Sequence, residues 1–165
     1  MSVASGGRRA QSTSGVRVAF GSARSTPSRF MSRPTTRSDV KRTVSTDEAP
    51  AAVGAYSQAT TNGDLLFTAG QIALTPDGEL RDDAPIAEQT ELALDNLLAV
   101  VEEAGADASD VLKTTVFLAD IDDFEEMNGT YAAYFGAEPP ARSAVEAGAL
   151  PKGVAVEIEA VASVE

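Results

Sequence analysis

The sequence predicts an α+β domain in which two helices cover one face of a sheet. Two segments, residues 85–104 and 123–135, carry apolar side chains at helical spacing. Strand-like segments rich in β-branched residues stand before, between and after them. Because two helices can cover only one face of such a sheet, the other face should be bare. A bare and partly apolar sheet face usually binds a partner, so we expect a homo-oligomer in which sheets pack together.

Charge is divided unevenly along the 165 residues, which are enough for one domain with a core. Residues 1–43 hold nine basic residues and one acidic residue, whereas residues 44–165 hold 4 basic and 24 acidic residues, a net charge of −20. Such a surface repels nucleic acid backbones and anionic lipids, so neither a nucleic acid nor a membrane is expected as a partner. The acidity also favours a salt-adapted, halophilic source; an acidic mesophilic protein is the alternative.

Residues 1–43 are rich in Ser, Thr, Arg and Gly and poor in large apolar side chains. They cannot bury enough surface to fold, so they are predicted to be a disordered basic extension before a folded domain at residues 44–165. Three explanations stay open: a targeting segment, a basic arm that binds an anionic partner, or a start assigned too early. In the last case translation would begin at Met31 or Val40.

The chain contains neither cysteine nor histidine. A disulfide framework, a thiolate nucleophile, Ser-His catalysis and a usual zinc site are therefore excluded, and no metal is expected. Acid–base chemistry must come from carboxylates, tyrosine, lysine or ordered water. No apolar run approaches the length of a membrane span, and we expect a cytoplasmic protein.

In chain order, residues 54–59 are predicted to be extended and residues 61–64 to form a hairpin turn. Residues 65–72 resemble one buried strand, in which Gly70 permits close approach of another chain or a ligand. The first helix should end at Gly105, and residues 111–118 should form the next strand.

The second helix, which should end at Gly136, contains Asn128 at its middle, where asparagine is unfavourable. Either Asn128 is simply exposed, or it makes a polar contact near a site.

The last thirty residues carry the most distinctive charges. Residues 139–146 and 154–161 both resemble strands by alternation. If the apolar faces of the two strands agree, Arg142 and Glu157 project from the same open face of the sheet. One guanidinium and one carboxylate among small residues would suit a small carboxylic acid. A sheet-face salt bridge with no chemistry is the alternative.

Six segments resemble motifs of the RidA (YjgF) family of reactive-intermediate deaminases. They are residues 54–59, 67–71, 111–118, 128–131, 140–143 and 156–160, and the resemblance spans about residues 42–165. The resemblance implies a chorismate-mutase-like α+β fold and a homotrimer with sites between subunits. It also implies hydrolysis of 2-aminoacrylate and related enamines or imines to a 2-oxo acid and ammonia, without a metal or an organic cofactor.

The same resemblance implies roles for individual residues. Arg142 matches the arginine that grips the substrate carboxylate, which suits its planar charged fork. Glu157 matches the glutamate that orients or activates the attacking water, and Tyr56 matches a tyrosine that lines the pocket. Gly70 and Asn128 match positions beside the ligand.

Departures from the family pattern bear on substrate range. Ala144 stands where several members have cysteine, and it keeps only the backbone N–H for a substrate contact. Ala55 replaces a usual proline before Tyr56, and Ala69 a serine of several members. A non-catalytic module that binds small metabolites or protects proteins is the alternative function.

The net charge of residues 44–165 predicts that the thermal midpoint of unfolding rises with salt. At low ionic strength the excess carboxylates repel one another across the surface, and ions screen this repulsion. Calorimetry between about 0.05 M and about 1 M sodium chloride measures the shift. Sucrose is the control, because it favours burial without screening charge. A midpoint that does not depend on salt would contradict the expectation.

Overall fold

The computed structural model describes residues 41–164. The expectations for residues 1–40, including both candidate starts, and for residue 165 lie outside the described residues. The first described strand, β1, spans Arg42–Val44, so it includes the last two residues of the predicted extension. Among residues 41–164 no helix has the length and the apolar character needed to cross a bilayer.

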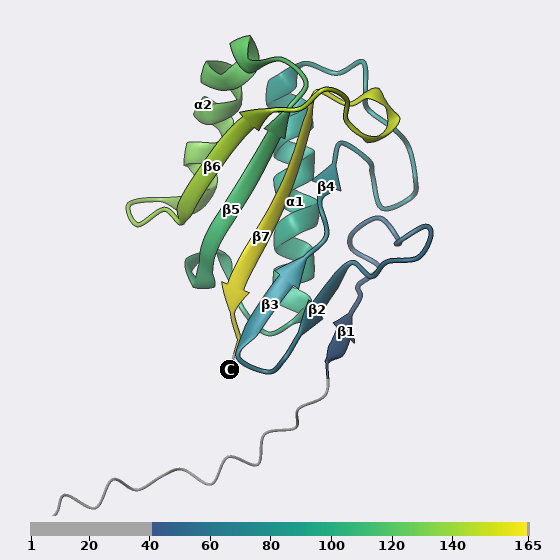
Figure 1. Ribbon diagram of the computed structural model, residues 1–165, viewed down its shortest axis with the longest axis vertical. Coiled ribbons are helices and arrows are strands. Elements are labelled where there is room, and N and C mark those ends of the chain that lie inside the picture. The colour runs from purple at the N-terminus through teal and green to yellow at the C-terminus, as the bar shows by residue number, and fades with distance from the viewer. Residues whose placement is uncertain (1–40, 165) are drawn as a thin grey trace, which may run out of the picture. The chain divides into compact units, whose positions relative to one another are not determined.

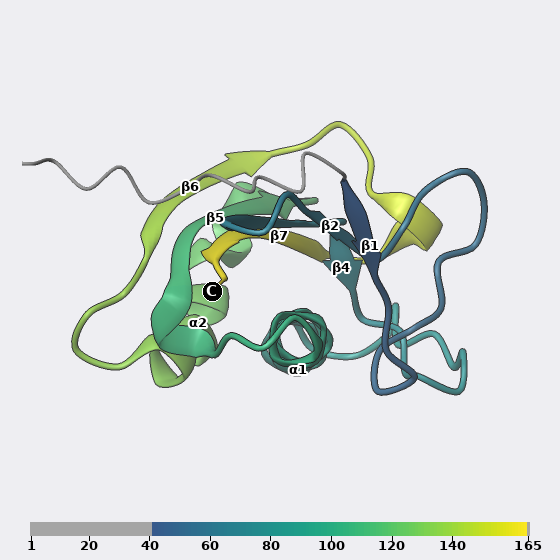
Figure 2. The same cartoon turned by 90° about the horizontal axis from the view of Figure 1, so that it is seen from below.

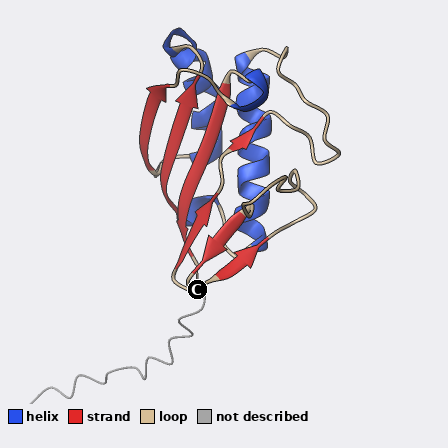
Figure 3. Ribbon diagram, turned by 45° about the vertical axis from the view of Figure 1, so that its right-hand side comes forward, coloured by secondary structure: helices blue, strands red, loops and turns tan. Residues whose placement is uncertain are grey.

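A mixed sheet forms one layer of the domain, with the strand order β1-β2-β3-β7-β5-β6 and β4 also paired with β7 (Figures 1 and 3). β5 and β6 run parallel, and the other pairs are antiparallel. The remaining strands are β2 (Ala59–Thr61), β3 (Leu65–Thr68), β4 (Gln71–Ile72), β5 (Val111–Leu118), β6 (Ala141–Glu146) and β7 (Val156–Ser163). Short 3₁₀ turns lie at Ala108–Asp110, Ile121–Asp123 and Pro151–Gly153.

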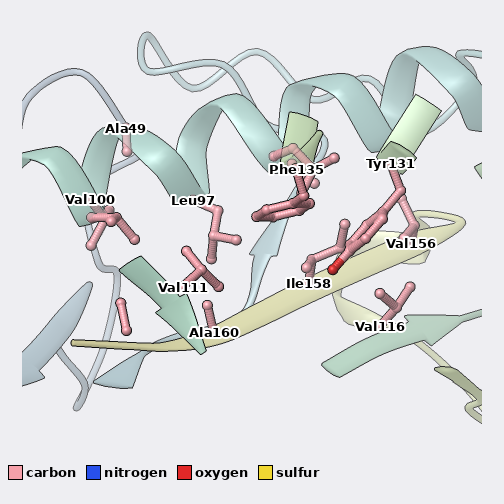
Figure 4. Close-up of a cluster of buried hydrophobic side chains, with 14 of the residues drawn as sticks. Ala49, Leu97, Val100, Val111, Val116, Tyr131, Phe135, Val156, Ile158 and Ala160 are labelled. Atoms are coloured by element: carbon pink, nitrogen blue, oxygen red, sulfur yellow. The ribbon is translucent and has the colours of Figure 1, made fainter. Parts of the chain in front are cut away.

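Helices α1 (Ile86–Glu103) and α2 (Phe124–Phe135) lie side by side on one face of the sheet, as predicted (Figure 2). The glycines after them, Gly105 and Gly136, have positive φ angles of 86° and 58°, a backbone that favours glycine. Between the helices and the sheet lies the apolar core (Figure 4), whose labelled members include Leu97, Val100, Val116, Tyr131, Phe135, Val156 and Ile158.

The alternation predicted for the last strand is confirmed. Val156, Ile158 and Ala160 are buried toward the helices, and Glu157 and Glu159 lie on the open face. The open face also carries apolar side chains, and on β3 the ring of Phe67 is 47% exposed.

The single strand predicted over residues 65–72 is wrong, because Ala69 and Gly70 divide it into β3 and β4. Phe67 pairs with Val161 and Gln71 pairs with Ile158. The segment from Phe67 to Gln71 therefore has one residue more than the segment of β7 that it faces. Such an extra residue defines a β-bulge, a feature that often lies next to a functional site.

The predicted hairpin before the bulge is confirmed. β2 and β3 pair antiparallel, and the side-chain oxygen of Asn62 accepts hydrogen bonds from the backbone N–H groups of Asp64 and Leu65.

Candidate active site

The strand register corrects the prediction that Arg142 and Glu157 share a face. On β5, Thr114 pairs with Arg142, whereas Phe117 pairs with Glu157. Paired residues on adjacent strands point to the same face, and Thr114 is fully buried toward the helices. Arg142 therefore projects toward α2, and Glu157 projects from the opposite, open face.

The prediction failed because it assumed that the apolar residues of β6 face the core. Val145 is instead 44% exposed on the open face, while Ala144 packs against the core. β6 is an edge strand, and on its helix-facing side the guanidinium of Arg142 lies against the Tyr131 ring of α2. A polar residue can occupy that side because its partners on α2 are aromatic and amide side chains.

A hollow of about 230 Å³ between α2 and β6 holds the guanidinium of Arg142. Its Nη2 donates a hydrogen bond of 2.8 Å to Oδ1 of Asn128. Its central carbon lies 4.4 Å from the ring centre of Tyr131 and 5.4 Å from that of Phe124. The Tyr131 hydroxyl shares a buried 2.7 Å hydrogen bond with Thr114, so the ring is held from both ends.

These contacts leave a fixed cation without an anionic partner. Within residues 41–164 the guanidinium of Arg142 forms no ion pair, and the ion pair found in this part of the chain joins Arg81 and Glu79. Stacking on aromatic faces and an amide contact orient a guanidinium without neutralising it. Arg142 is therefore held in place with its charge available for an external carboxylate.

A second hollow, of about 640 Å³, lies on the other side of the sheet around Glu157. The lining includes Tyr56 and the irregular segment before β2, the bulge at Ala69 and Gly70, and the turn at Pro151 and Lys152. Lys152 has φ 57° and is the non-glycine residue with positive φ in the described chain. Much of the lining is apolar, with few polar groups, as in small-molecule sites.

Gly70 makes room for the carboxyl group of Glu157. A Cβ atom at position 70 would overlap the Glu157 side chain, at 2.6 Å from Cδ and 2.8 Å from Cγ. Real contacts are never so short, so any other residue would force Glu157 out of its present rotamer. The sequence predicted that Gly70 allows another chain or a ligand to approach, whereas the group that lies against Gly70 in the structure is the carboxyl group of Glu157 in the same chain.

Burial raises the pKa of Glu157 above its ordinary value, and the nearby carboxylate of Glu159 raises it further. Both effects disfavour the charged form. A carboxylate with a raised pKa is a stronger base once it is deprotonated, which suits proton abstraction from water.

The structure thus divides the predicted site residues into two groups. Tyr56, Gly70 and Glu157 line the larger hollow, and Arg142 and Asn128 line the smaller one. Ala144, also on β6, packs against the core and lines neither.

Sequence reasoning assigned no site role to the rings beside Arg142. The signal was present, because Phe124 and Tyr131 lie one helical turn on either side of Asn128.

Comparisons with known proteins agree with this fold and these motifs. The family described as Endoribonuclease L-PSP, to which the YjgF and RidA proteins belong, matches residues 46–164. The chain is a member of this RidA (YjgF) family.

Among the relatives is the 2-iminobutanoate/2-iminopropanoate deaminase of Escherichia coli K12. It is 46% identical over 127 residues, covering 74% of this chain and 98% of the relative. The crystal structure of the E. coli YjgF gene product superposes with a TM-score of 0.71 at 46% identity, over 74% of this chain and 98% of that one. The crystal structure of E. coli TdcF with bound serine gives a TM-score of 0.71 at 39% identity, and the match covers 75% of this chain and 99% of TdcF.

Replacing Gly70 with alanine should move the carboxyl group of Glu157 without unfolding the protein. The added methyl group overlaps only a flexible side chain, which can rotate toward solvent. The pKa of Glu157 should then fall toward the ordinary glutamate value, because burial is its main cause. Carboxyl carbon NMR during a pH titration measures this.

The matched control is Gly129→Ala on α2, where a Cβ atom would have no neighbour within 4 Å. It should stabilise the helix by about 0.5–1 kcal/mol and leave the Glu157 titration unchanged. An unaltered Glu157 titration in Gly70→Ala would show that Gly70 does not set the carboxyl position.

Proposed function

We propose that the protein hydrolyses reactive 2-imino and 2-enamino acids, such as 2-iminopropanoate and its tautomer 2-aminoacrylate, to 2-oxo acids and ammonia. The proposal rests on two features of one chain: an oriented Arg142 with no ion pair among residues 41–164, and a Glu157 that lies in a hollow and has a raised pKa. The chain is also 46% identical to a protein named 2-iminobutanoate/2-iminopropanoate deaminase. A further relative is named as binding serine, a small amino acid.

Two copies of the chain are needed for one complete site in this proposal. Within one chain, strand pairing directs Arg142 and Glu157 to opposite faces. Their pairing partners on β5, Thr114 and Phe117, are also three residues apart, about 10 Å along the strand. A small imino acid cannot reach both groups, so the smaller hollow of one copy should meet the larger hollow of its neighbour. A homotrimer with sites at its three seams satisfies this requirement, because a cyclic arrangement repeats one such contact.

The chemistry needs only binding, orientation and one proton acceptor. Arg142 binds the substrate carboxylate through paired N–H groups. The carboxylate of Glu157 takes a proton from water as the oxygen bonds to C2, and it returns this proton to the imine nitrogen, which gives a carbinolamine. As the C–N bond then breaks, Glu157 carries the hydroxyl proton to the nitrogen, so ammonia leaves and the hydroxyl oxygen becomes the carbonyl oxygen of the 2-oxo acid. Holding water and imine together supplies much of the acceleration.

The charge of the folded part argues against RNA as the substrate, although the family description names an endoribonuclease. Residues 44–165 carry a net charge of −20, which repels a phosphate backbone.

Substitutions at Arg142 and Glu157 should separate binding from turnover. Arg142→Ala should abolish binding of pyruvate, a loss of about 2–5 kcal/mol, and Arg142→Lys should recover little because ammonium lacks the planar fork. Glu157→Gln should retain pyruvate binding but lower turnover about 10²–10⁴-fold. Calorimetry measures binding, and ammonia release from 2-aminoacrylate generated from serine measures turnover, both at high salt.

Glu159→Gln is the matched control, because Glu159 lies on the same strand and face as Glu157. It should retain turnover and shift the acid limb of the pH–rate profile to lower pH, since Glu159 raises the pKa of Glu157. Wild-type protein that binds pyruvate but does not accelerate ammonia release would favour a metabolite-binding module. A Glu157→Gln variant with wild-type turnover would remove Glu157 from the mechanism.

Mixing the two inactive variants tests whether one site uses two copies. When Arg142→Ala and Glu157→Gln chains are unfolded and refolded together, about one quarter of the sites should combine an intact arginine with an intact glutamate. Activity should return toward that fraction of the wild-type value. Each variant refolded alone is the control. Complete absence of recovery, with mixed oligomers confirmed by mass, would place both groups in a site within one chain.

A further inference from the structure

The segment that carries Tyr56 into the larger hollow has no regular secondary structure. β1 ends at Val44 and β2 begins at Ala59, and the residues between them form neither helix nor strand. Five of them line the hollow and form one wall of it: Pro50, Ala51, Val53, Tyr56 and Gln58. Val53 is 84% exposed and Tyr56 is 56% exposed, so contacts at the tip do not hold this wall in place.

One buried side chain, that of Gln58, closes this segment into a loop. Gln58 is only 3% exposed. Its Oε1 accepts a 2.7 Å hydrogen bond from the backbone N–H of Thr46, and its Nε2 donates to the backbone carbonyl of the same residue at 3.0 Å. Nε2 also lies 3.2 Å from the carbonyl oxygen of Ala49 and 2.9 Å from that of Pro50. The beginning of the segment is thereby bound to its end.

The orientation of this amide follows from its neighbours. Three carbonyl oxygens surround the nitrogen and an N–H group faces the oxygen, so a flipped amide would place oxygen against oxygen. With both ends engaged with the backbone, the Gln58 side chain has little capacity left for a substrate.

The backbone of Gln58 joins the same wall to the bulge below Glu157. Its carbonyl oxygen accepts a 2.8 Å hydrogen bond from the N–H of Ala69, the residue before Gly70. Gln58 therefore lies between the loop that presents Tyr56 and the turn against which the Glu157 carboxyl group rests.

We infer that Gln58 is the positioning residue of the substrate pocket: its buried amide holds the Tyr56 wall opposite Glu157 at the distance that a small imino acid requires. The inference rests on the proposed function, because the pocket is assigned to substrate there. Without the amide, the partly buried N–H group of Thr46 and the buried carbonyl group of Ala49 would lose their partner, which is costly, so the loop would open toward water. A wall displaced by about 1 Å can lower catalytic efficiency about 10²-fold.

The test substitutes Gln58 with methionine, which fills similar space without hydrogen bonds, and with glutamate, which keeps the shape but loses the donors. The matched control is Gln89→Met. Gln89 is 2% exposed on α1 and also bonds only to backbone, at Asp82, Ala84 and Ala155. None of these three partners lines the hollow.

Gln58→Met and Gln58→Glu should raise KM for the imino acid about 10–100-fold, with kcat changed much less, because Arg142 and Glu157 stand on other elements. Gln89→Met should lower the melting temperature without raising KM. In a double-mutant cycle, Gln58→Met should have little further effect in a Tyr56→Ala background, whereas Gln89→Met should add independently. Equal KM values in the Gln58 and Gln89 variants, or full additivity with Tyr56→Ala, would overturn the inference.

Hydrogen exchange separates this inference from the proposed function. Gln58→Met should speed amide exchange at residues 45–57 and at Ala69, and Gln89→Met should not. If the wild-type protein hydrolyses no imine, the proposed function fails, and unchanged exchange at residues 45–57 in Gln58→Met would overturn the loop-holding role separately.

Discussion

The hydrogen-bond register of β5 with β6 and β7 determines from which face of the sheet Arg142 and Glu157 project. β5 pairs in parallel with β6 and antiparallel with β7, and side chains in register share a face. Arg142 is thereby fixed against α2, and Glu157 against the bulge on the opposite side. A shift of β7 by one residue would turn Glu157 and Glu159 into the core, and a shift of β6 by one residue would turn Arg142 to the open face. The position of Arg142 in the smaller hollow and of Glu157 in the larger one follows from this register.

Sequence patterns predicted the helices and strands whose buried residues recur at regular spacing, but they did not predict which side chains of the edge strand β6 face the core. α1, α2, β5 and β7 each pack one side against a continuous core, so their apolar spacing is regular. β6 has no such regularity, because among the described strands it pairs with β5 alone, and its polar Arg142 faces inward on aromatic rings. The bulge was also hidden, since Ala69 and Gly70 fit a strand pattern and only the pairing shows the extra residue.

The motif resemblance and the physics of single residues contributed differently to the candidate site. Resemblance selected six positions, of which Tyr56, Gly70, Asn128, Arg142 and Glu157 line the two hollows and Ala144 does not. The resemblance did not show how these residues are held in place. Where the pocket wall has no regular secondary structure, buried side-chain amides hold the backbone: Gln58 does so in the loop before β2, and Asn96 on α1 donates to the carbonyl groups of Ile72 and Leu74. Each amide fixes a stretch of pocket wall without a strand or helix.

At the bulge between β3 and β4, the number of residues in the chain decides which side chains of β4 face the core. Leu66 is buried before it, and Gln71 and Ala73 are buried after it, so the inward phase changes from even to odd numbers across one extra residue. Deleting or inserting one residue there would turn β4 inside out and remove the space under Glu157 together. The length of the chain at this turn is therefore fixed by two requirements at once, the burial of β4 and the space for the Glu157 carboxyl group. Gaps in alignments of related chains should avoid residues 67–72.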